Sequence, residues 1–393
     1  MRILGINRLH PGDILGKSIY NEKSELLLAA GFRLDDEVIG LIKKHGFNYV
    51  HLIDKATEGI VPEVVISDTL RHSAQVSMVN AFDTIRSNPA MKTLDSTNVM
   101  QHLKEDKKIG RLVKMRSIRT LVGDIMAEIL DNNVKIFVSL PVKSISGHEY
   151  EHAIDTTLLS ILIAREFDFS PKDLTELGTA ALLHNIGKLI FVDSPDQDEK
   201  EKETFKKLLI KEHPTYSRLL IEGSEQYSYT EQLIVHQHHE RLDGTGFPQG
   251  LRSINKPPSF HTTNKWAQIH KHALILAVAN YYDNLLSGTE DGKHYTPVQA
   301  LAIMIDQAGT AWNSHVIKAL GNVIRRYPVG CPIIIKDNTS KTNIGYVGVV
   351  SENDMAEPDK PEVILTHNSH GNAIRPQKIN LREEQTVQIE LDI

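Results

Sequence analysis

Histidines are concentrated in the middle third of this chain of 393 residues. His152, His184 and His213 lie at intervals along it, and the pair His238-His239 follows. Imidazole is a common ligand for zinc, iron and manganese, and the helices of a bundle can direct several ligands into one interior cavity. Each histidine taken alone is more readily explained as an ordinary packed or surface residue. Taken together, the five favour a site for divalent transition metal ions.

Two motifs around these histidines resemble those of the HD-GYP family. Residues 238–248 read HHERLDGTGFP, which resembles the family signature HHExxDGxGYP with Phe247 in place of the tyrosine. Residues 182–188 read LLHNIGK and resemble LLHDIGK. The resemblance covers residues 115–327, and members of this family are metal-dependent phosphohydrolases that hydrolyse the bacterial second messenger cyclic di-GMP. It implies a helical, metal-dependent domain in a bacterial signalling protein.

The resemblance also implies seven metal-ligand positions. They are occupied here by His152, His184, Asn185, His213, His238, His239 and Asn280. The family has aspartate at positions 185 and 280, and a carboxylate at position 185 would bridge two cations, whereas an amide supplies one oxygen and no charge. We therefore expect a degenerate, partly occupied or empty site for iron, manganese or zinc, with fewer than two tightly held ions. In the alternative, both amides still bind metal through their oxygen atoms.

Lys188, His148 and Lys293 extend the set of candidate site residues. Lys188 matches a catalytic lysine that contacts the substrate phosphate, although a lysine near a helix end is often only solvated. His148 lies four residues before His152 and Glu149 three before it, so either could supply a further ligand from the same helix face. Alternatively, the helix begins after His148, because a glycine precedes that residue. Lys293 stands in a weak match to the family's substrate-binding motif.

Two loops near the second motif are candidates for contacts with substrate or partners. The GYP-like loop consists of Asp243, Gly244, Gly246, Phe247 and Pro248 with the residues between them. Residues 252–272 make an insertion relative to the family pattern, and it contains His261, Trp266, His270 and His272. We interpret the insertion as a lid, a partner surface or a plain surface loop, since loops tolerate extra length.

The combined pattern predicts a regulatory protein that binds cyclic di-GMP or a related dinucleotide and has weak or absent phosphodiesterase activity. One alternative is an active metal-dependent phosphodiesterase with an altered metal site. Another is an adaptor that binds no nucleotide and contacts other proteins through the 252–272 insertion and the terminal modules. Protein partners are expected, and the sequence leaves homo-oligomer formation open.

Apolar periodicity predicts a mainly α protein with four parts. Residues 1–54 mix short strands with a helix over 35–45 and form a small α+β module. Residues 55–110 are expected to be a helical connector with no readable function. Residues 111–328 form a helical bundle of the HD-GYP type, and 329–393 form a small β-rich appendix. Strands are expected there at 332–335, 345–350, 362–365 and 386–391.

Composition and charge exclude several classes of protein. The net charge is −6 and the pI about 6.3, so no global positive field would draw the chain to DNA or to an anionic membrane. Cys331 is the single cysteine, which excludes an internal disulfide framework. The sequence shows no secretory signal and no apolar run of membrane-spanning length, so we expect a cytoplasmic protein.

Overall fold

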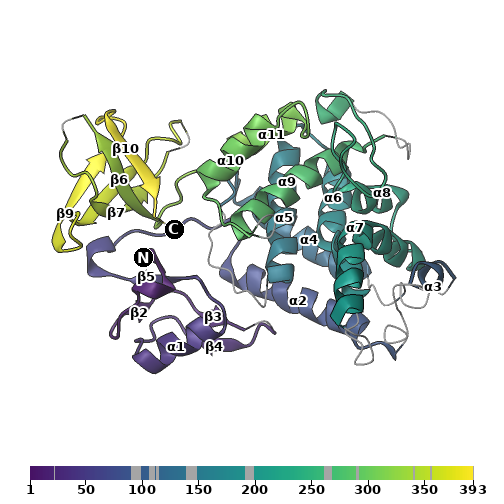
Figure 1. Cartoon of the computed structure of the whole chain (residues 1–393), viewed down its shortest axis with the longest axis horizontal. Helices are drawn as coiled ribbons and strands as arrows, with labels where there is room; N and C mark the ends of the chain where they lie inside the picture. Colours follow the sequence, from purple (N-terminus) through teal and green to yellow (C-terminus); the bar gives the residue numbers. More distant parts are fainter. Residues whose placement is uncertain are drawn as a thin grey trace.

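The computed structural model describes residues 1–21, 23–89, 99–105, 111, 115–138, 148–190, 199–260, 268–288, 292–339, 341–354 and 356–392. Figure 1 shows a helical body, with a small N-terminal module and a C-terminal sheet on one side of it. The mainly α fold predicted from the sequence, with an α+β module before the helices and strands after them, is confirmed.

The N-terminal module packs one helix against a small antiparallel sheet. Its strands are β1 (Arg2–Gly5), β2 (Ile14–Leu15), β3 (Ile19–Tyr20), β4 (Leu26–Leu28) and β5 (Tyr49–Ile53). β5 lies between β1 and β2, and β3 pairs with β4. α1 (Asp36–Lys44) begins after Asp35, whose side chain accepts a hydrogen bond from the Val38 N–H. The same helix buries Ile39 and Ile42 in the core of the module.

Two helices of the segment 55–110 pack into the helical body. They are α2 (Asp68–Arg86), which Ser67 caps, and α3 (Val99–Glu105). α2 buries Met78, Phe82 and Ile85, which lie on one helix face and belong to the same hydrophobic core as the central helices. The opposite face of α2 is polar.

The helical body is built around α5 and α9. Its helices are α4 (Met115–Asp131), α5 (His148–Arg165), α6 (Pro171–Leu183), α7 (Glu199–Gly223), α8 (Tyr229–Gln237), α9 (Lys271–Ser287), α10 (Pro297–Asp306) and α11 (Ser314–Val323). α5 packs against α6 and α9, and the runs 158–164 and 273–279 on these two helices are entirely buried. Polar residues on such helices need partners, so His152, Asn280 and Asp283 stand out as site residues.

A five-stranded antiparallel sheet lies at the C-terminal end, in the order β10-β6-β7-β8-β9. Its strands are β6 (Pro332–Asn338), β7 (Val347–Glu352), β8 (Glu362–His367), β9 (Ala373–Asn380) and β10 (Val387–Leu391). Four of them overlap the predicted strands. β9 was missed because it is an edge strand that includes Pro376 and is mostly exposed, so it shows no apolar alternation.

Ile3 joins the N-terminal module to the C-terminal sheet. Its N–H donates to Gly330 O (2.8 Å), and its side chain shares a core with Cys331 and Ile333. Arg8 of the module also forms an ion pair with Asp392. The two ends of the chain therefore lie near one another, as Figure 1 shows.

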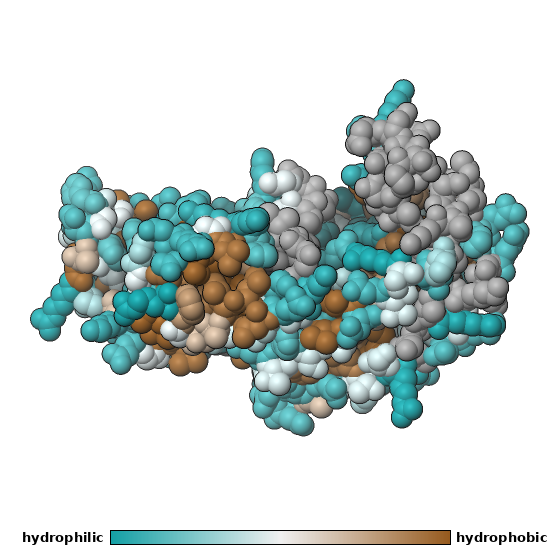
Figure 2. Space-filling model, turned by 90° about the horizontal axis from the view of Figure 1, so that it is seen from below, coloured by the Kyte–Doolittle hydropathy of each residue, from teal (hydrophilic) through white to brown (hydrophobic). Residues whose placement is uncertain are grey.

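Exposed apolar side chains occur on the N-terminal module and on the segment that follows it. They include Leu26, Phe32, Leu41, Ile53, Val61 and Val64. Figure 2, which views the molecule from below, shows apolar areas within a largely hydrophilic surface. Among the described residues, no helix has both the length and the hydropathy needed to cross a membrane.

Candidate metal centre

Four helices bring the five predicted histidines into one buried cluster. His152 lies on α5, His184 at the C-cap of α6 and His213 within α7, while His238 caps α8 and His239 follows it. Neighbouring imidazole rings have centroids 4.3 to 5.2 Å apart. The first four side chains are at most 3% exposed. We refer to these five residues as the histidine cluster.

Free backbone carbonyls at helix ends orient two of the rings. His184 Nδ1–H donates to Ala181 O (2.7 Å), and His238 Nδ1–H donates to Val235 O (2.6 Å). Both carbonyls lie in the last turn of a helix, where they have no partner from the helix itself. The imidazole therefore satisfies the carbonyl, and the carbonyl fixes the proton on Nδ1.

His213 obtains the same kind of partner inside a helix because a proline follows it. Pro214 has no N–H to donate to Ile210 O, four residues earlier. That carbonyl accepts a hydrogen bond from His213 Nδ1–H instead (2.8 Å). In these three rings the Nε2 atom consequently carries the lone pair, as a metal ligand must.

The Nε2 atoms meet in pairs. His152 Nε2 lies 3.1 Å from His184 Nε2, and His213 Nε2 lies 3.2 Å from His238 Nε2. In the neutral His213–His238 pair Nδ1 holds the proton in both rings, so two lone pairs face one another. Nitrogen ligands about 2.0–2.1 Å from one cation stand about 2.9–3.4 Å apart at octahedral to tetrahedral angles. The donor set therefore fits divalent transition metal ions, which would relieve this repulsion.

Three histidines make the tightest group. One ligand nitrogen from each of His213, His238 and His239 lies within 4.8 Å of the others. Phe247 of the GYP-like loop stacks on the His239 ring, with the centroids 4.4 Å apart and the planes at 17°. Position 247 thus contributes an aromatic face to the cluster even though the tyrosine hydroxyl of the family signature is absent.

The two asparagines lie at the cluster in different surroundings. Asn280 of α9 is buried and hydrogen-bonds the His184 side chain. Asn185 directly follows His184, and its buried Oδ1 atom has no hydrogen-bond partner among the described residues. An unsatisfied buried oxygen costs about 1–3 kcal/mol, and a cation bound to it would offset that cost. Asn185 can therefore serve as a ligand, but it brings no negative charge.

Asp283 completes the site, although sequence reasoning gave it no role. It lies on α9 one turn after Asn280, is fully buried, and accepts a hydrogen bond from His152 Nδ1–H (2.7 Å). A carboxylate behind a histidine fixes the tautomer and makes the ring a better metal ligand. The sequence did carry a signal for this residue: Asp283 is an acidic residue three positions after Asn280, and it follows an apolar helical run.

Lys188 adds positive charge beside the histidines. It lies in the 3₁₀ helix η5 (Ile186–Ile190), and burial lowers the pKa of its ammonium group while the Glu149 carboxylate acts in the opposite direction. Burial also holds the pKa values of four cluster histidines well below their usual value, and the charge of Lys188 contributes to each shift. The four are His184, His213, His238 and His239.

The GYP-like loop is anchored to the backbone of the histidine pair. Buried Glu240 accepts hydrogen bonds from the N–H groups of Gln249 and Leu251, each at 2.7 Å. Gly246 packs so closely that a Cβ atom there would lie 2.5 Å from Arg241 N. The loop therefore holds Phe247 against the cluster through contacts that need a glycine and a buried carboxylate.

Three other predicted residues lie at the edge of the site or away from it. Lys293 is exposed between α9 and α10, outside the buried cluster. α5 begins at His148, so the alternative in which the helix starts after that residue is wrong, and the His148 side chain itself lies outside what the structure describes. Glu149 is exposed and forms an ion pair with Arg86 (2.9 Å).

The 252–272 insertion is described only in part. His261 and Trp266 lie outside the described residues. His270 caps α9 by accepting a hydrogen bond from the His272 N–H (3.3 Å), and His272 Nε2 lies 3.1 Å from Asp173 Oδ1. Both side chains are buried; His272 packs α9 against α6, and His270 caps α9.

Comparison with known proteins finds one family match and several relatives. Residues 124–315 match the HD domain family. A cyclic di-GMP phosphodiesterase of Pseudomonas aeruginosa is 26% identical over 280 residues, which are 70% of this chain and 61% of that protein. A cyclic di-GMP phosphodiesterase of Borreliella burgdorferi is 26% identical over 212 residues, 51% of this chain and 52% of that protein. A 3'3'-cGAMP-specific phosphodiesterase of Vibrio cholerae is 29% identical over 189 residues, 47% of this chain and 36% of that protein.

The helical bundle carries buried histidines that could hold a metal ion, and residues 124–315 of it match the HD domain family. With the matches above, they confirm the resemblance stated from the motifs: this chain is a divergent relative of the HD-GYP phosphodiesterases. The chain covers 61% and 52% of the lengths of the Pseudomonas and Borreliella proteins.

The lowered histidine pKa values predict that the metal-free protein loses stability in mild acid. Each of the four shifted histidines is neutral when folded and takes up a proton on unfolding below a pH of about 6.5. Stability should therefore be fully present above that pH and fall below it, by up to about 1.4 kcal/mol per pH unit for each histidine. Urea unfolding in EDTA between pH 8 and 5 measures this. A constant unfolding free energy over that range would contradict the prediction.

Proposed function

We propose that this chain is a cyclic dinucleotide signalling protein of the bacterial cytoplasm, which binds cyclic di-GMP or a related dinucleotide at the histidine cluster and hydrolyses it slowly or not at all. The observation that carries this proposal is the pair of amides at the cluster. Asn185 and Asn280 stand where the family has carboxylates, while the histidines and Lys188 around them are retained.

The charge of the site supports binding without turnover. An amide at position 185 cannot offset the repulsion between two neighbouring cations, so a second ion is held weakly. The same substitution removes negative charge that would repel a phosphate. Lys188 and any ion bound by histidine therefore face an anionic ligand with less opposing charge than in a carboxylate-containing site. The result is a site that attracts phosphate oxygens better than it assembles a two-ion centre.

The residues divide into those that hold an ion and those that hold the ligand. His213, His238 and His239 would hold one ion, and His152 and His184 a weaker one, with Asp283 orienting His152. A bound divalent ion would supply Lewis-acid polarisation of a phosphoryl oxygen. Lys188 donates to a phosphate oxygen, and the loop around Phe247 bounds the site on the His239 side.

A second candidate function, an active phosphodiesterase with an altered metal site, has one observation in its favour. The Asn185 Oδ1 atom is buried without a partner, as an amide that binds metal would be before the ion arrives. Metal content and turnover distinguish this candidate from the first. An adaptor that binds no nucleotide is the third outcome of the same experiment.

We expect the protein purified without chelators to retain about one tightly held transition metal ion per chain, at the three-histidine group. It should bind cyclic di-GMP in calorimetry yet hydrolyse it far below the usual enzyme range of about 1 per second or more. His239→Asn should remove the ion, whereas His294→Asn, a change at an exposed histidine, should not. Two dialysis-resistant ions with ordinary turnover would establish the active enzyme, and absence of nucleotide binding would establish the adaptor.

A further inference from the structure

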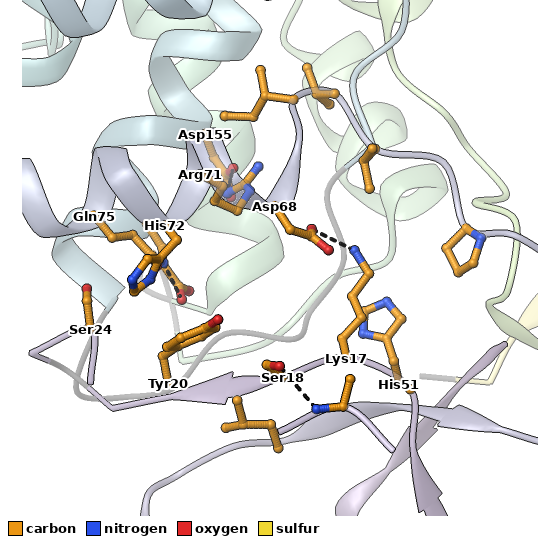
Figure 3. A pocket seen from close by; sticks show the side chains of 18 of the residues that line it. Lys17, Ser18, Tyr20, Ser24, His51, Asp68, Arg71, His72, Gln75 and Asp155 are labelled. Carbon is orange, nitrogen blue, oxygen red and sulfur yellow. Dashed lines mark hydrogen bonds and ion pairs between the residues drawn. The ribbon is translucent and has the colours of Figure 1, made fainter. Parts of the chain in front are cut away.

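The N-terminal module and the helical body enclose a cavity of about 410 Å³, which we call the interdomain cavity. Its walls come from β3, β5 and the residues before β3 on one side, and from α2 and α5 on the other (Figure 3). None of its described lining residues is a predicted metal ligand. Its volume lies in the range of about 300–1,000 Å³ that small-molecule sites occupy.

One face of α2 points its polar residues into this cavity. Asp68, Arg71, His72 and Gln75 have the i, i+3, i+4, i+7 spacing of a single helix face, and all four line the cavity. A helix face that packs against another domain is ordinarily apolar, because burial of polar groups without partners is costly. A polar face at this place is instead what a ligand site needs.

Two histidine side chains that line the cavity each have a buried ring nitrogen without a hydrogen-bond partner among the described residues. His51 is only 8% exposed, and its Nε2 atom has no hydrogen-bond partner among the described residues. Burial lowers the pKa of His51 to about 4, so the ring is neutral at pH 7. The His72 Nδ1 atom is also buried without a partner in the described part of the chain. The His72 ring packs on Tyr20, with centroids 4.4 Å apart, so the pair forms an aromatic wall.

Two ion pairs line the cavity, and the carboxylates of Glu63 and Glu151 line it as well. Lys17 Nζ lies 2.9 Å from Asp68 Oδ1, and Arg71 Nη1 lies 2.8 Å from Asp155 Oδ1. Figure 3 shows Lys17 reaching up from the strand side toward Asp68 on α2, with His51 next to it. A polyanion such as a cyclic dinucleotide would be repelled by these carboxylates, and a simple cation would make no favourable contact with Lys17 or Arg71.

A zwitterion is the ligand that matches this arrangement. It offers an ammonium group to a carboxylate and a carboxylate group to a cation, so no charge is buried without an opposite one. In the Lys17–Asp68 pair the Lys17 side chain is 24% exposed and the Asp68 side chain 69% exposed, so two such groups can extend the pair into a ring of alternating charges. The remaining lining includes apolar Ile19, Phe47 and Ile66, which suit an apolar side chain.

We propose that the interdomain cavity binds a free amino acid, with its charged groups at Lys17 and Asp68 and its side chain against Tyr20 and His72. The bound molecule also lies beside α5, because Asp155 and Glu151, which flank His152 on that helix, line the same cavity. Arg71 and Gln75 connect α2 to these two residues.

The test measures the melting temperature of the full-length protein in EDTA with each standard amino acid at millimolar concentration. EDTA keeps metal out of the histidine cluster, so the outcome is independent of the function proposed for that cluster. At least one amino acid should raise the melting temperature in a concentration-dependent way. Its decarboxylated amine and its deaminated acid should bind at least about tenfold more weakly, because each leaves one charge unmatched. No stabilisation by any amino acid would overturn the proposal.

Variants then locate the site. Tyr20→Ala and Lys17→Gln should each weaken binding of the stabilising amino acid in calorimetry by at least about tenfold. Tyr229→Ala makes the same change as the first variant at an exposed tyrosine at the start of α8, and it should leave the affinity unchanged. If Tyr20→Ala does not fold, Lys17→Gln decides alone, since Lys17 is not part of a core. Unaltered affinity in Lys17→Gln would overturn the assignment.

Discussion

Asn185→Asp combined with Asn280→Asp is expected to raise the metal content from about one ion to about two per chain and to increase cyclic di-GMP hydrolysis by more than about tenfold. The wild-type cluster already places imidazole pairs with Nε2 atoms 3.1 and 3.2 Å apart, so the nitrogen ligands for two ions are present. What the wild type lacks is negative charge between them.

Each aspartate is expected to act through a different neighbour. At position 185 the carboxylate replaces an amide whose Oδ1 is buried without a partner, and its second oxygen can reach another ion. At position 280 the carboxylate replaces an amide that hydrogen-bonds His184, and it adds a charged ligand beside the His152–His184 pair. Neither change enlarges the side chain, so the packing of α9 and η5 should be preserved.

Elemental analysis and product chromatography on the same sample measure the two effects. Asn48→Asp with Asn372→Asp is the control, because both residues are exposed and the double change adds the same charge far from the cluster. This control should keep the wild-type ion content and turnover. A carboxylate variant that retains one ion or fewer would show that charge at these positions is not what limits the site.

The motifs located the histidine cluster because its members lie at helix ends and beside a proline, where short sequence patterns are informative. His184 and His238 directly follow the ends of α6 and α8, and His213 precedes Pro214. The carbonyl partners that orient these rings could not be read from the sequence, since they depend on which backbone groups the helices leave free. The role of Asp283 required knowing that α5 and α9 pack side by side.

Other elements were predictable only where apolar periodicity was strong. α1 has a buried face and a clear capping residue, and the helix predicted over 35–45 overlaps it. β9 is an exposed edge strand, so it has no such pattern. The interdomain cavity was invisible for another reason. Its walls combine Lys17 and His51 of one domain with Asp68 and Asp155 of another, and no local motif links them.

Gly187→Ala is expected to destabilise the protein by about 1–3 kcal/mol or more and to abolish tight metal binding. Gly187 lies in η5, which directly follows His184 and Asn185, and it packs on the turn of α7 that carries His213. A Cβ atom there would lie 2.6 Å from Ser217 N and 2.8 Å from Ser217 Oγ, and nearer still to the His213 carbonyl oxygen. Because most of these atoms belong to a helix backbone, they cannot move aside cheaply.

The same contact links the two halves of the histidine cluster, which is why the effect should extend to metal binding. The Gly187 N–H donates to Ser217 Oγ (2.8 Å), and the Ser217 hydroxyl donates to His184 O (2.8 Å). A methyl group at position 187 would push η5 away from α7 and separate His184 from His213. Urea unfolding in EDTA followed by elemental analysis measures both losses.

The matched control is Gly123→Ala on the exposed face of α4, where a Cβ meets no atom within 4 Å. That change should stabilise the helix by up to about 1 kcal/mol and leave the metal content unaltered. If Gly187→Ala and Gly123→Ala were equally stable, the close approach of η5 to α7 would not require a glycine at position 187.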